Sequence, residues 1–269
     1  MPTVRPQPTK PIRSRDNPRY KEFKRLATVA SARARSGLTL LDGVHLCGEW
    51  LAHCGQPQTC VVAQGALANQ EVAALLSRVE SARRVVLDDA LFAPLAQVEH
   101  GPGLLFIVAV PRPALPARVA GPCVLLDRLQ DPGNLGSILR SAAAAGVGRV
   151  LCAPGTVAAW SPKVLRAGMG AHFRLAIHED CDLALLLPTI AGPVLAMSSH
   201  ATASLYTADL TGASWLFGNE GQGVAPALMN AGVVPLVIPQ PGGMESLNVA
   251  AAAAVCLFEQ VRQGLVKQR

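Results

Sequence analysis

The sequence predicts an α/β protein built in two parts, and three observations support that fold class. Short apolar runs of strand length alternate with helical patterns along most of the 269 residues. Half of the residues are hydrophobic and 16% are charged, so the chain has enough apolar surface to bury a sizeable core. A segment dense in proline, residues 111–121, divides the pattern into two series and is predicted to be a linker.

The first series of elements, within residues 18–110, predicts a small α/β domain. Its apolar runs are separated by segments whose apolar residues recur at helical spacing. The predicted strands are 38–41, 60–63, 85–87 and 104–110, and the predicted helices between them are 45–53, 70–78 and 90–98.

The second series, within residues 122–269, predicts a parallel sheet with helices on both faces. Its strands are continuous apolar runs that alternate with helices, which is typical of strands buried on both sides. The predicted strands are 124–126, 150–152, 175–177, 194–197, 215–217 and 234–238, and the clearest helices are 135–145 and 247–262. The longest uncharged run, 183–208, contains Pro188, Gly192 and Pro193, so we interpret it as a helix end, a turn and a strand rather than a membrane span.

Positive charge is concentrated at the N-terminus. Residues 1–35 carry ten Lys and Arg against two acidic side chains, a local net charge of +8, whereas the rest of the chain carries −2. We expect residues 1–17 to form a basic flexible arm that suits a polyanion such as nucleic acid. A solvated tail that only improves solubility explains the same charge. An acidic membrane surface is less favoured, because residues 21–35 have a broken apolar face.

The cysteine and histidine patterns give no indication of disulfides or of a metal site. The seven cysteines form an odd set without a C-x-x-C motif, which indicates reduced thiols. The six histidines show no H-E-x-x-H motif, and none pairs with a cysteine at ligand spacing. No apolar stretch of signal-peptide type follows the N-terminus, so we expect a cytoplasmic protein without a metal or a membrane partner.

Three loops that follow predicted strands of the second series carry the candidate site residues. Ligands bind at the carboxyl ends of parallel strands, so polar loops at those ends are the places to search. The first loop, 131–140, reads DPGNLGSILR, in which Asn134 is either a site residue or the N-cap of the next helix. Arg140 lies six residues further on, and its alternative interpretation is a solvated surface arginine.

The second and third loops are rich in glycine. The second, 217–224, reads FGNEGQGV, which is not the G-x-G-x-x-G dinucleotide fingerprint but still implies a close backbone approach. Glu220 in this loop is either a hydrogen-bonding anchor or an exposed side chain. The third, 238–249, reads IPQPGGMESLNV and leads into the last helix, which Glu245 or Ser246 is in position to cap.

Together, the order and spacing of these loops resemble the SpoU (TrmH-type) branch of the SPOUT family of RNA methyltransferases. The resemblance extends over about residues 122–262, and its third motif is the most specific. The positions that match the three motifs are Asn134 and Arg140; Gly218, Glu220 and Gly223; and Ile238, Pro239, Ser246, Leu247, Asn248 and Val249. Segments 14–26 and 40–46 are similar, less closely, to an RNA substrate-binding domain often fused ahead of this catalytic domain. Asp42 and Gly43 stand there in place of the Glu-Gly of relatives.

The resemblance implies a fold, a cofactor and a quaternary structure that composition does not show. The implied fold is a SPOUT domain, a parallel sheet with a deep trefoil knot, within residues 122–269, preceded by the smaller RNA-binding α/β domain at 18–110. The implied methyl donor is S-adenosylmethionine (AdoMet), held at Gly218, Ile238 and Leu247. The implied assembly is a homodimer with its active sites at the interface. The implied catalytic set, acting on RNA, is Arg140, Asn134, Glu220, Ser246 and Asn248.

The implied reaction is methylation of a ribose 2′-hydroxyl, with Arg140 as the activating residue. A guanidinium is effectively always protonated. Arg140 therefore either acts as a base in an unusually dry, cationic site, or stays charged and stabilises the developing alkoxide while solvent or a substrate phosphate takes the proton. We favour the second version. Glu220 is expected to accept hydrogen bonds, from Asn134 or from Arg140.

The substrate is expected to be ribosomal RNA, with transfer RNA as the alternative. A catalytically inactive RNA-binding relative is a further alternative, although the complete set of matched motif residues argues against it. An ordinary doubly wound, nucleotide-dependent enzyme has less support, because neither half has a glycine-rich first βα turn.

Overall fold

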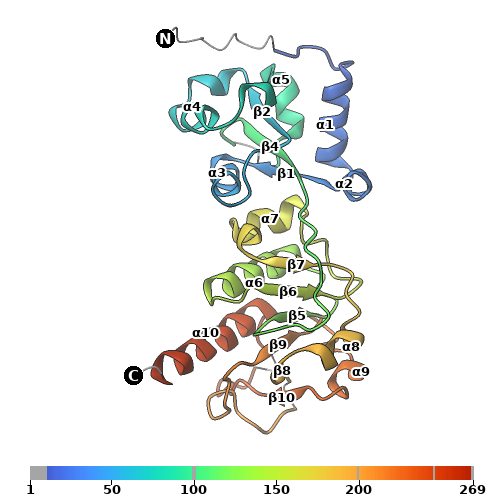
Figure 1. Cartoon of the computed structure of the whole chain (residues 1–269), viewed down its shortest axis with the longest axis vertical. Helices are drawn as coiled ribbons and strands as arrows, with labels where there is room; N and C mark the ends of the chain where they lie inside the picture. The colour runs from blue at the N-terminus through green and yellow to red at the C-terminus, as the bar shows by residue number, and fades with distance from the viewer. Residues whose placement is uncertain (1–10, 99–100, 199, 245, 268–269) are drawn as a thin grey trace. The chain divides into compact units, whose positions relative to one another are not determined.

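The computed structural model describes residues 11–98, 101–198, 200–244 and 246–267, and the chain divides into two compact units (Figure 1). Unit 1 comprises Met1–Pro111 and Trp160–Arg166, and unit 2 comprises Arg112–Ala159 and Ala167–Arg269. The boundary after Pro111 falls at the start of the proline-rich segment, where proline removes backbone donors and stops regular elements. Residues 160–166, which lie within the second series of the sequence, contribute to unit 1 instead.

Unit 1 contains a four-stranded sheet. Its strands are β1 (Leu38–Asp42), β2 (Thr59–Ala63), β3 (Arg84–Leu87) and β4 (Leu104–Ala109), in the spatial order β1-β4-β2-β3. Strand β4 is antiparallel to β1 and β2, whereas β2 and β3 are parallel. The four predicted strands are confirmed, because each is an apolar run that is largely buried.

The helices that connect these strands agree with the prediction except in one length. Helices α3 (Val44–His53) and α4 (Gln70–Ser77) confirm it, and short 3-10 turns lie at η1 (Gly65–Ala68) and η2 (Ser81–Arg83). The helix predicted at 90–98 is wrong in extent. Helix α5 (Asp89–Phe92) ends early and a 3-10 turn, η3 (Ala93–Leu95), follows, because Pro94 lacks the N–H that would continue the helix.

Two basic helices precede the sheet and are not among the predicted elements. Helix α1 (Pro18–Thr28) packs on the sheet and is followed by α2 (Ala30–Ser36) (Figure 1). Tyr20, Phe23 and Leu26 of α1 are buried in the core of unit 1, so this apolar stripe is sufficient despite the dense Lys and Arg. Of the arm expected at 1–17, residues 1–10 lie outside the described residues. Ile12 already pairs with Leu87 at the end of β3.

Unit 2 contains a six-stranded parallel sheet, which confirms the fold class predicted for the second series. Its strands are β5 (Val124–Leu126), β6 (Arg149–Cys152), β7 (Ala176–His178), β8 (Val194–Met197), β9 (Ser214–Phe217) and β10 (Val234–Leu236), in the spatial order β10-β8-β9-β5-β6-β7. Every neighbouring pair is parallel. Strands β9 and β5 are adjacent in the middle, so their carboxyl ends bring two of the candidate loops together.

Helices cover both faces of this sheet (Figure 1). Helices α6 (Pro132–Ala144) and α10 (Val249–Lys267) lie side by side along one face, and α8 (Leu183–Leu186) and α9 (Pro226–Met229) lie along the other. The uncharged run at 183–208 contains α8, a 3-10 turn and β8, as predicted. Among the described residues, α10 alone has the length and composition to cross a membrane; here Ala253, Cys256 and Leu257 bury one side of it in unit 2. The remaining short elements are α7 (Pro162–Gly168), η4 (Ala171–Arg174) and η5 (Leu187–Thr189).

Candidate active site

Two loops and the end of a strand in unit 2 surround a cavity of about 670 Å³. They are the glycine-rich loop after β9 (218–224), the described part of the segment between β10 and α10 (237–244 and 246–248), and residues 197, 198 and 200 at and just after the end of β8. The volume lies within the range of about 300–1,000 Å³ that small-molecule sites occupy. The lining residues considered below are Gly218, Glu220, Gln222, Val224, Ile238, Gln240, Ser246, Leu247 and Asn248.

The loop after β5 leads into α6, which carries Asn134 and Arg140. Helix α6 begins at Pro132, because the Oδ1 of Asp131 accepts a hydrogen bond from the backbone N–H of Asn134 at 2.7 Å. Asp131 is therefore the N-cap, and the interpretation of Asn134 as the cap is wrong. Arg140 lies on the exposed side of α6 and has no hydrogen bond or ion pair with any described residue.

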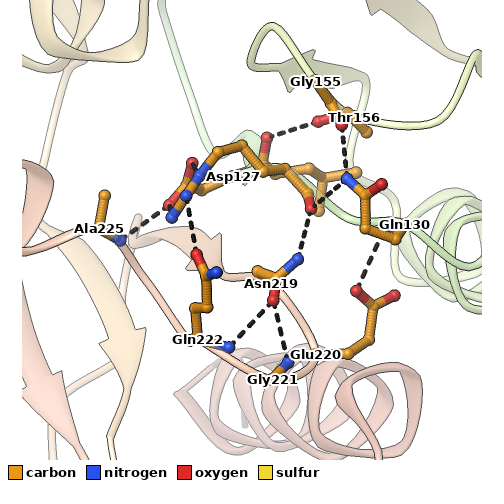
Figure 2. A network of polar contacts seen from close by, with 11 residues as sticks. Asp127, Gln130, Gly155, Thr156, Asn219, Glu220, Gly221, Gln222 and Ala225 are labelled. Atoms are coloured by element: carbon orange, nitrogen blue, oxygen red, sulfur yellow. Dashed lines mark hydrogen bonds and ion pairs between the residues drawn. The ribbon is translucent and has the colours of Figure 1, made fainter.

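The glycine-rich loop after β9 is a tight turn whose backbone closes on itself. Asn219 and Gly223 exchange two backbone N–H···O hydrogen bonds of 3.0 and 2.9 Å. The Oδ1 of Asn219 accepts from the backbone N–H groups of Gly221 and Gln222, each at 3.0 Å (Figure 2). A Cβ at Gly218 would lie 2.2 Å from the carbonyl carbon of Gly223, so only glycine fits at that position.

Glu220 anchors this loop to the start of α6. One of its carboxylate oxygens accepts from the backbone N–H of Gln130 at 3.0 Å (Figure 2). The other accepts from the N–H of Asp131 and the Nδ2 of Asn134, each at 3.1 Å. Burial raises the pKa of Glu220, but these hydrogen bonds to the charged form outweigh it and leave the pKa below the usual 4.5. Of the two interpretations of Glu220, the contacts favour the anchor.

Asn248 connects the third loop to the first. Its Oδ1 caps α10 by accepting from the backbone N–H groups of Ala250 at 2.9 Å and Ala251 at 3.2 Å. Its Nδ2 donates to the Oδ1 of Asn134 at 3.0 Å. Because Asn134 also donates to Glu220, side chains from three loops form one hydrogen-bonded chain.

The structure brings most of the predicted site residues together. Those that line the cavity are Gly218, Glu220, Ile238, Ser246, Leu247 and Asn248. Asn134 joins them through its hydrogen bonds, whereas Arg140 does not line the cavity. Asn248, and not Ser246, caps α10, so that part of the prediction is wrong; Glu245 lies outside the described residues.

Several residues of the surrounding network are not among those the sequence singles out. They are Asp127, Arg128, Gln130, Asn219 and Gln222. Asp127 and Asn219 carried a usable signal, since each is polar and stands at or just past the end of an apolar strand of the parallel sheet. The contact between Arg128 and Gln222 joins residues 94 apart, and no local pattern indicates it.

The cavity suits the expected cofactor, AdoMet. Its wall contains apolar side chains, among them Val224, Ile238 and Leu247. The Oε1 of Gln240 in the wall is buried and has no hydrogen-bond partner, so it can accept from the adenine amino group or the ammonium group of AdoMet. Within the described part of the chain, no group of three or more His, Cys, Asp or Glu is arranged to hold a metal ion.

Comparison with known proteins gives the same assignment at the level of sequence. The SpoU rRNA methylase family matches residues 121–258, more than half of the chain. An uncharacterized tRNA/rRNA methyltransferase of Synechocystis sp. is 33% identical over 261 residues, which cover 94% of this chain and 93% of the relative. The 23S rRNA (guanosine(2553)-2′-O)-methyltransferase RlmP of Bacillus subtilis is 29% identical, over 93% of this chain and 98% of the relative.

Solved structures extend the agreement to the fold. An RNA 2′-O ribose methyltransferase superposes with a TM-score of 0.79 at 29% identity, over 94% of this chain and 99% of the other. The SpoU methyltransferase AviRb from Streptomyces viridochromogenes, in complex with AdoMet, superposes with a TM-score of 0.81 at 25% identity, over 93% and 98%. These findings confirm the resemblance carried by the three motifs and the expected cofactor. The chain belongs to the SpoU rRNA methylase family and is an AdoMet-dependent RNA 2′-O-methyltransferase.

Proposed function

We propose that this chain methylates a ribose 2′-hydroxyl of ribosomal RNA and binds AdoMet in the cavity of unit 2. The observation that carries the proposal is the hydrogen-bonded chain from Glu220 through Asn134 to Asn248, which joins three loops beside the cavity. Ribosomal RNA is favoured over transfer RNA because RlmP, which matches nearly the whole chain, is named for a 23S rRNA nucleotide.

The cavity wall supplies the contacts for the cofactor. Bound AdoMet provides an electrophilic methyl group on a sulfonium. Gly218, Ile238 and Leu247 hold it through backbone and apolar contacts, since all three line the cavity, and Gln240 adds a buried acceptor. The loop around Gly218, closed by the two backbone hydrogen bonds between Asn219 and Gly223, would hold the bound cofactor in one position.

The polar residues beside the cavity act on the RNA. In the reaction the 2′-oxygen bonds to the methyl carbon, the carbon–sulfur bond breaks, and the hydroxyl proton passes to solvent or a substrate phosphate. Arg140 stays protonated, binds the adjacent phosphate and stabilises the developing alkoxide. Asn134 orients the ribose and is held in place by Glu220 and Asn248. Ser246 and Asn248 order the third loop.

The Glu220 anchor gives the first prediction. Glu220→Gln is expected to raise the AdoMet dissociation constant about tenfold, because the amide nitrogen then faces donors and leaves one of them unsatisfied. The carboxylate's contribution to stability is complete above the usual pKa of 4.5 and is lost as the pH falls through the lowered pKa of the folded state. Calorimetric titration at neutral pH and thermal unfolding between neutral and acid pH measure the two effects. The exposed Glu22→Gln is the control, and a wild-type affinity in Glu220→Gln would contradict the anchor role.

A second copy of the chain is part of the proposal. Arg140 does not line the cavity of its own chain, and α10, the neighbour of α6, exposes Phe258 (48%) and Leu265 and Val266 (60% each). An exposed apolar surface on the helix that packs against α6 suits a homodimer, in which Arg140 of one copy completes the RNA-binding side of the other copy's active site. We also propose, from the family resemblance, that the chain of unit 2 follows a knotted path. A cytoplasmic location, expected from the sequence, is likewise part of the proposed function.

Unit 1, with residues 18–110 as its RNA-binding domain, binds RNA phosphates through α1 and α2. On α1, Lys21, Lys24 and Arg25 are exposed and lie within about 100° of arc, away from the buried stripe. Arg33 of α2 fixes the junction of the two helices, since its Nη1 donates to the carbonyl of Leu26 at 2.8 Å. The basic face is therefore held rigid before RNA binds.

The basic face gives a prediction on salt dependence. Lys24→Gln with Arg25→Gln is expected to weaken RNA binding about tenfold at low salt and to reduce the slope of log affinity against log salt by about 2, since two phosphate contacts are lost. Filter binding across a salt series measures both. Arg78→Gln, at the end of α4 in the same unit, is the matched control with no expected change. An unchanged slope in the double variant would show that Lys24 and Arg25 of α1 do not contact RNA phosphates.

Transfer of label from tritiated AdoMet into total RNA, separated by size, tests the proposed function. Alkali-resistant label at one site of ribosomal RNA, absent with Arg140→Ala, is the expected result. Label in transfer RNA instead would show that the substrate is transfer RNA and not ribosomal RNA. The absence of label despite AdoMet binding would favour an RNA-binding protein without activity. The assay uses both assembled ribosomal subunits and protein-free RNA, so that methylation is detected whichever of the two forms is the substrate.

A further inference from the structure

Arg128 stands at the junction of three loops of unit 2. Its φ of 57° is left-handed, a region that residues other than glycine rarely adopt. In this conformation its carbonyl oxygen accepts hydrogen bonds from the Nδ2 of Asn219 and the Nε2 of Gln130, each at 3.0 Å. The Nε2 of Gln130 also donates to the carbonyl of Gly155 at 2.6 Å (Figure 2). The carbonyl of Arg128 and the side chain of Gln130 thus join the loops after β5, β6 and β9.

The side chain of Arg128 holds the glycine-rich loop at a second point. Its Nε and Nη2 donate to the two carboxylate oxygens of Asp127, at 2.9 and 3.2 Å, and its Nη1 donates to the Oε1 of Gln222 at 3.1 Å. Asp127 is 3% exposed and also accepts from the backbone N–H of Ala225 at 2.8 Å. Asp127 and Arg128 together therefore contact the loop at Asn219, Gln222 and Ala225.

We propose that Arg128 is a positioning residue for AdoMet binding, whose guanidinium fixes residues 218–225 in the conformation that walls the cavity. The inference rests on the proposed function, because it takes the cavity as the AdoMet site. Gly218, Glu220 and Gln222 of this loop line the cavity, so a displaced loop changes the wall. Arg128 is not a lining residue and acts through them.

The backbone conformation separates two explanations for an arginine at this position. If only the left-handed turn mattered, glycine would serve better, because it adopts this φ without steric strain. An arginine in this conformation is expected where side-chain contacts outweigh the strain. Here those contacts are the paired hydrogen bonds to Asp127 and the bond to Gln222.

Calorimetric titration of AdoMet into the full-length chain tests the role of the guanidinium. Arg128→Gly relieves the backbone strain but leaves the buried Asp127 carboxylate without its charged partner, so we expect the AdoMet dissociation constant to rise about tenfold together with a lower thermal midpoint. Gln222→Ala should have a similar effect, and the double variant should be no weaker than either single one, because both changes break the same contact. Arg128→Lys keeps the charge beside Asp127 and should recover part of the affinity. With saturating AdoMet, kcat should stay within about twofold of wild type.

Two results would overturn the inference: an unchanged dissociation constant in Arg128→Gly, or a double variant whose loss is the product of the two single losses. Arg118→Gly, at an exposed arginine outside the network, is the matched control. Leu247→Ala separates this inference from the proposed function, since Leu247 lines the cavity but is absent from the network. If Leu247→Ala also binds AdoMet normally, the cavity is not the AdoMet site. If it weakens binding while Arg128→Gly does not, the role of Arg128 alone is wrong.

Discussion

Gly218→Ala is expected to raise the AdoMet dissociation constant by about 100-fold or more, which places binding beyond detection in most titrations. The added Cβ would lie 2.2 Å from the carbonyl carbon of Gly223 and 2.2 Å from the nitrogen of Val224. Both atoms belong to the backbone, so no rotamer change relieves the contact and the loop has to open. Opening separates Asn219 from Gly223 and removes the cavity wall.

The control for this result is another glycine-to-alanine change. Gly148→Ala is suitable, because a Cβ there meets no atom within 4 Å and the residue lies outside the cavity lining. Circular dichroism separates a lost site from a lost fold, since opening one loop leaves the six-stranded sheet intact. AdoMet binding by Gly218→Ala within about threefold of wild type would show that the closed loop is not required.

Arg140→Ala is expected to lower kcat for methyl transfer by about 10²- to 10³-fold, the usual effect of removing a group that stabilises developing negative charge. AdoMet affinity should not change, because Arg140 does not line the cavity. A pH–rate profile of Arg140→Lys distinguishes the two roles of Arg140. A charged stabiliser predicts a partly active enzyme with no new ionisation, whereas a base predicts a near-normal plateau and a new ionisation at lower pH.

Mixing two inactive variants tests which copy supplies Arg140. If Arg140 of one chain serves the cavity of the other, Arg140→Ala and Gly218→Ala form mixed dimers with one intact site each. Random exchange then restores about a quarter of the wild-type activity. If Arg140 serves its own cavity, the mixture stays inactive, and the dimer contributes no residue to the site.

The strands and the strand-end loops could be predicted from the sequence because their signals are local. A run such as 124–126 is apolar without interruption, since both faces of a central parallel strand are covered. Asn134, Glu220 and Asn248 follow such runs in loops too polar and glycine-rich to pack in a core. Asn134 and Glu220 meet because β5 and β9 are adjacent, a strand order that the sequence did not predict. Asn248 reaches Asn134 from the segment after β10, which lies at the edge of the sheet.

The remaining features depend on tertiary contacts. Helix α1 is not predicted from the sequence, because Lys and Arg surround its few buried residues. Packing against the sheet is what makes this narrow apolar stripe sufficient to stabilise the helix. Capping is similarly ambiguous: Asp131 and Asn134 are both good N-caps, and the choice depends on Asn134 being engaged by Glu220 and Asn248. Arg128 has the left-handed backbone conformation that usually favours glycine. Residues that depart from such local preferences often belong to functional sites.

The hydrogen bond between Asn134 and Asn248 has a consequence for the newly made protein. The two residues are 114 positions apart, and the second one caps the helix that ends the described chain. During synthesis on the ribosome, Asn134 is therefore made well before Asn248, its hydrogen-bond partner, has been translated. At about 5–20 residues per second, several seconds separate the two events. A nascent chain cannot complete the hydrogen-bonded chain during that interval, and we expect the enzyme to become competent only after α10 has left the exit tunnel.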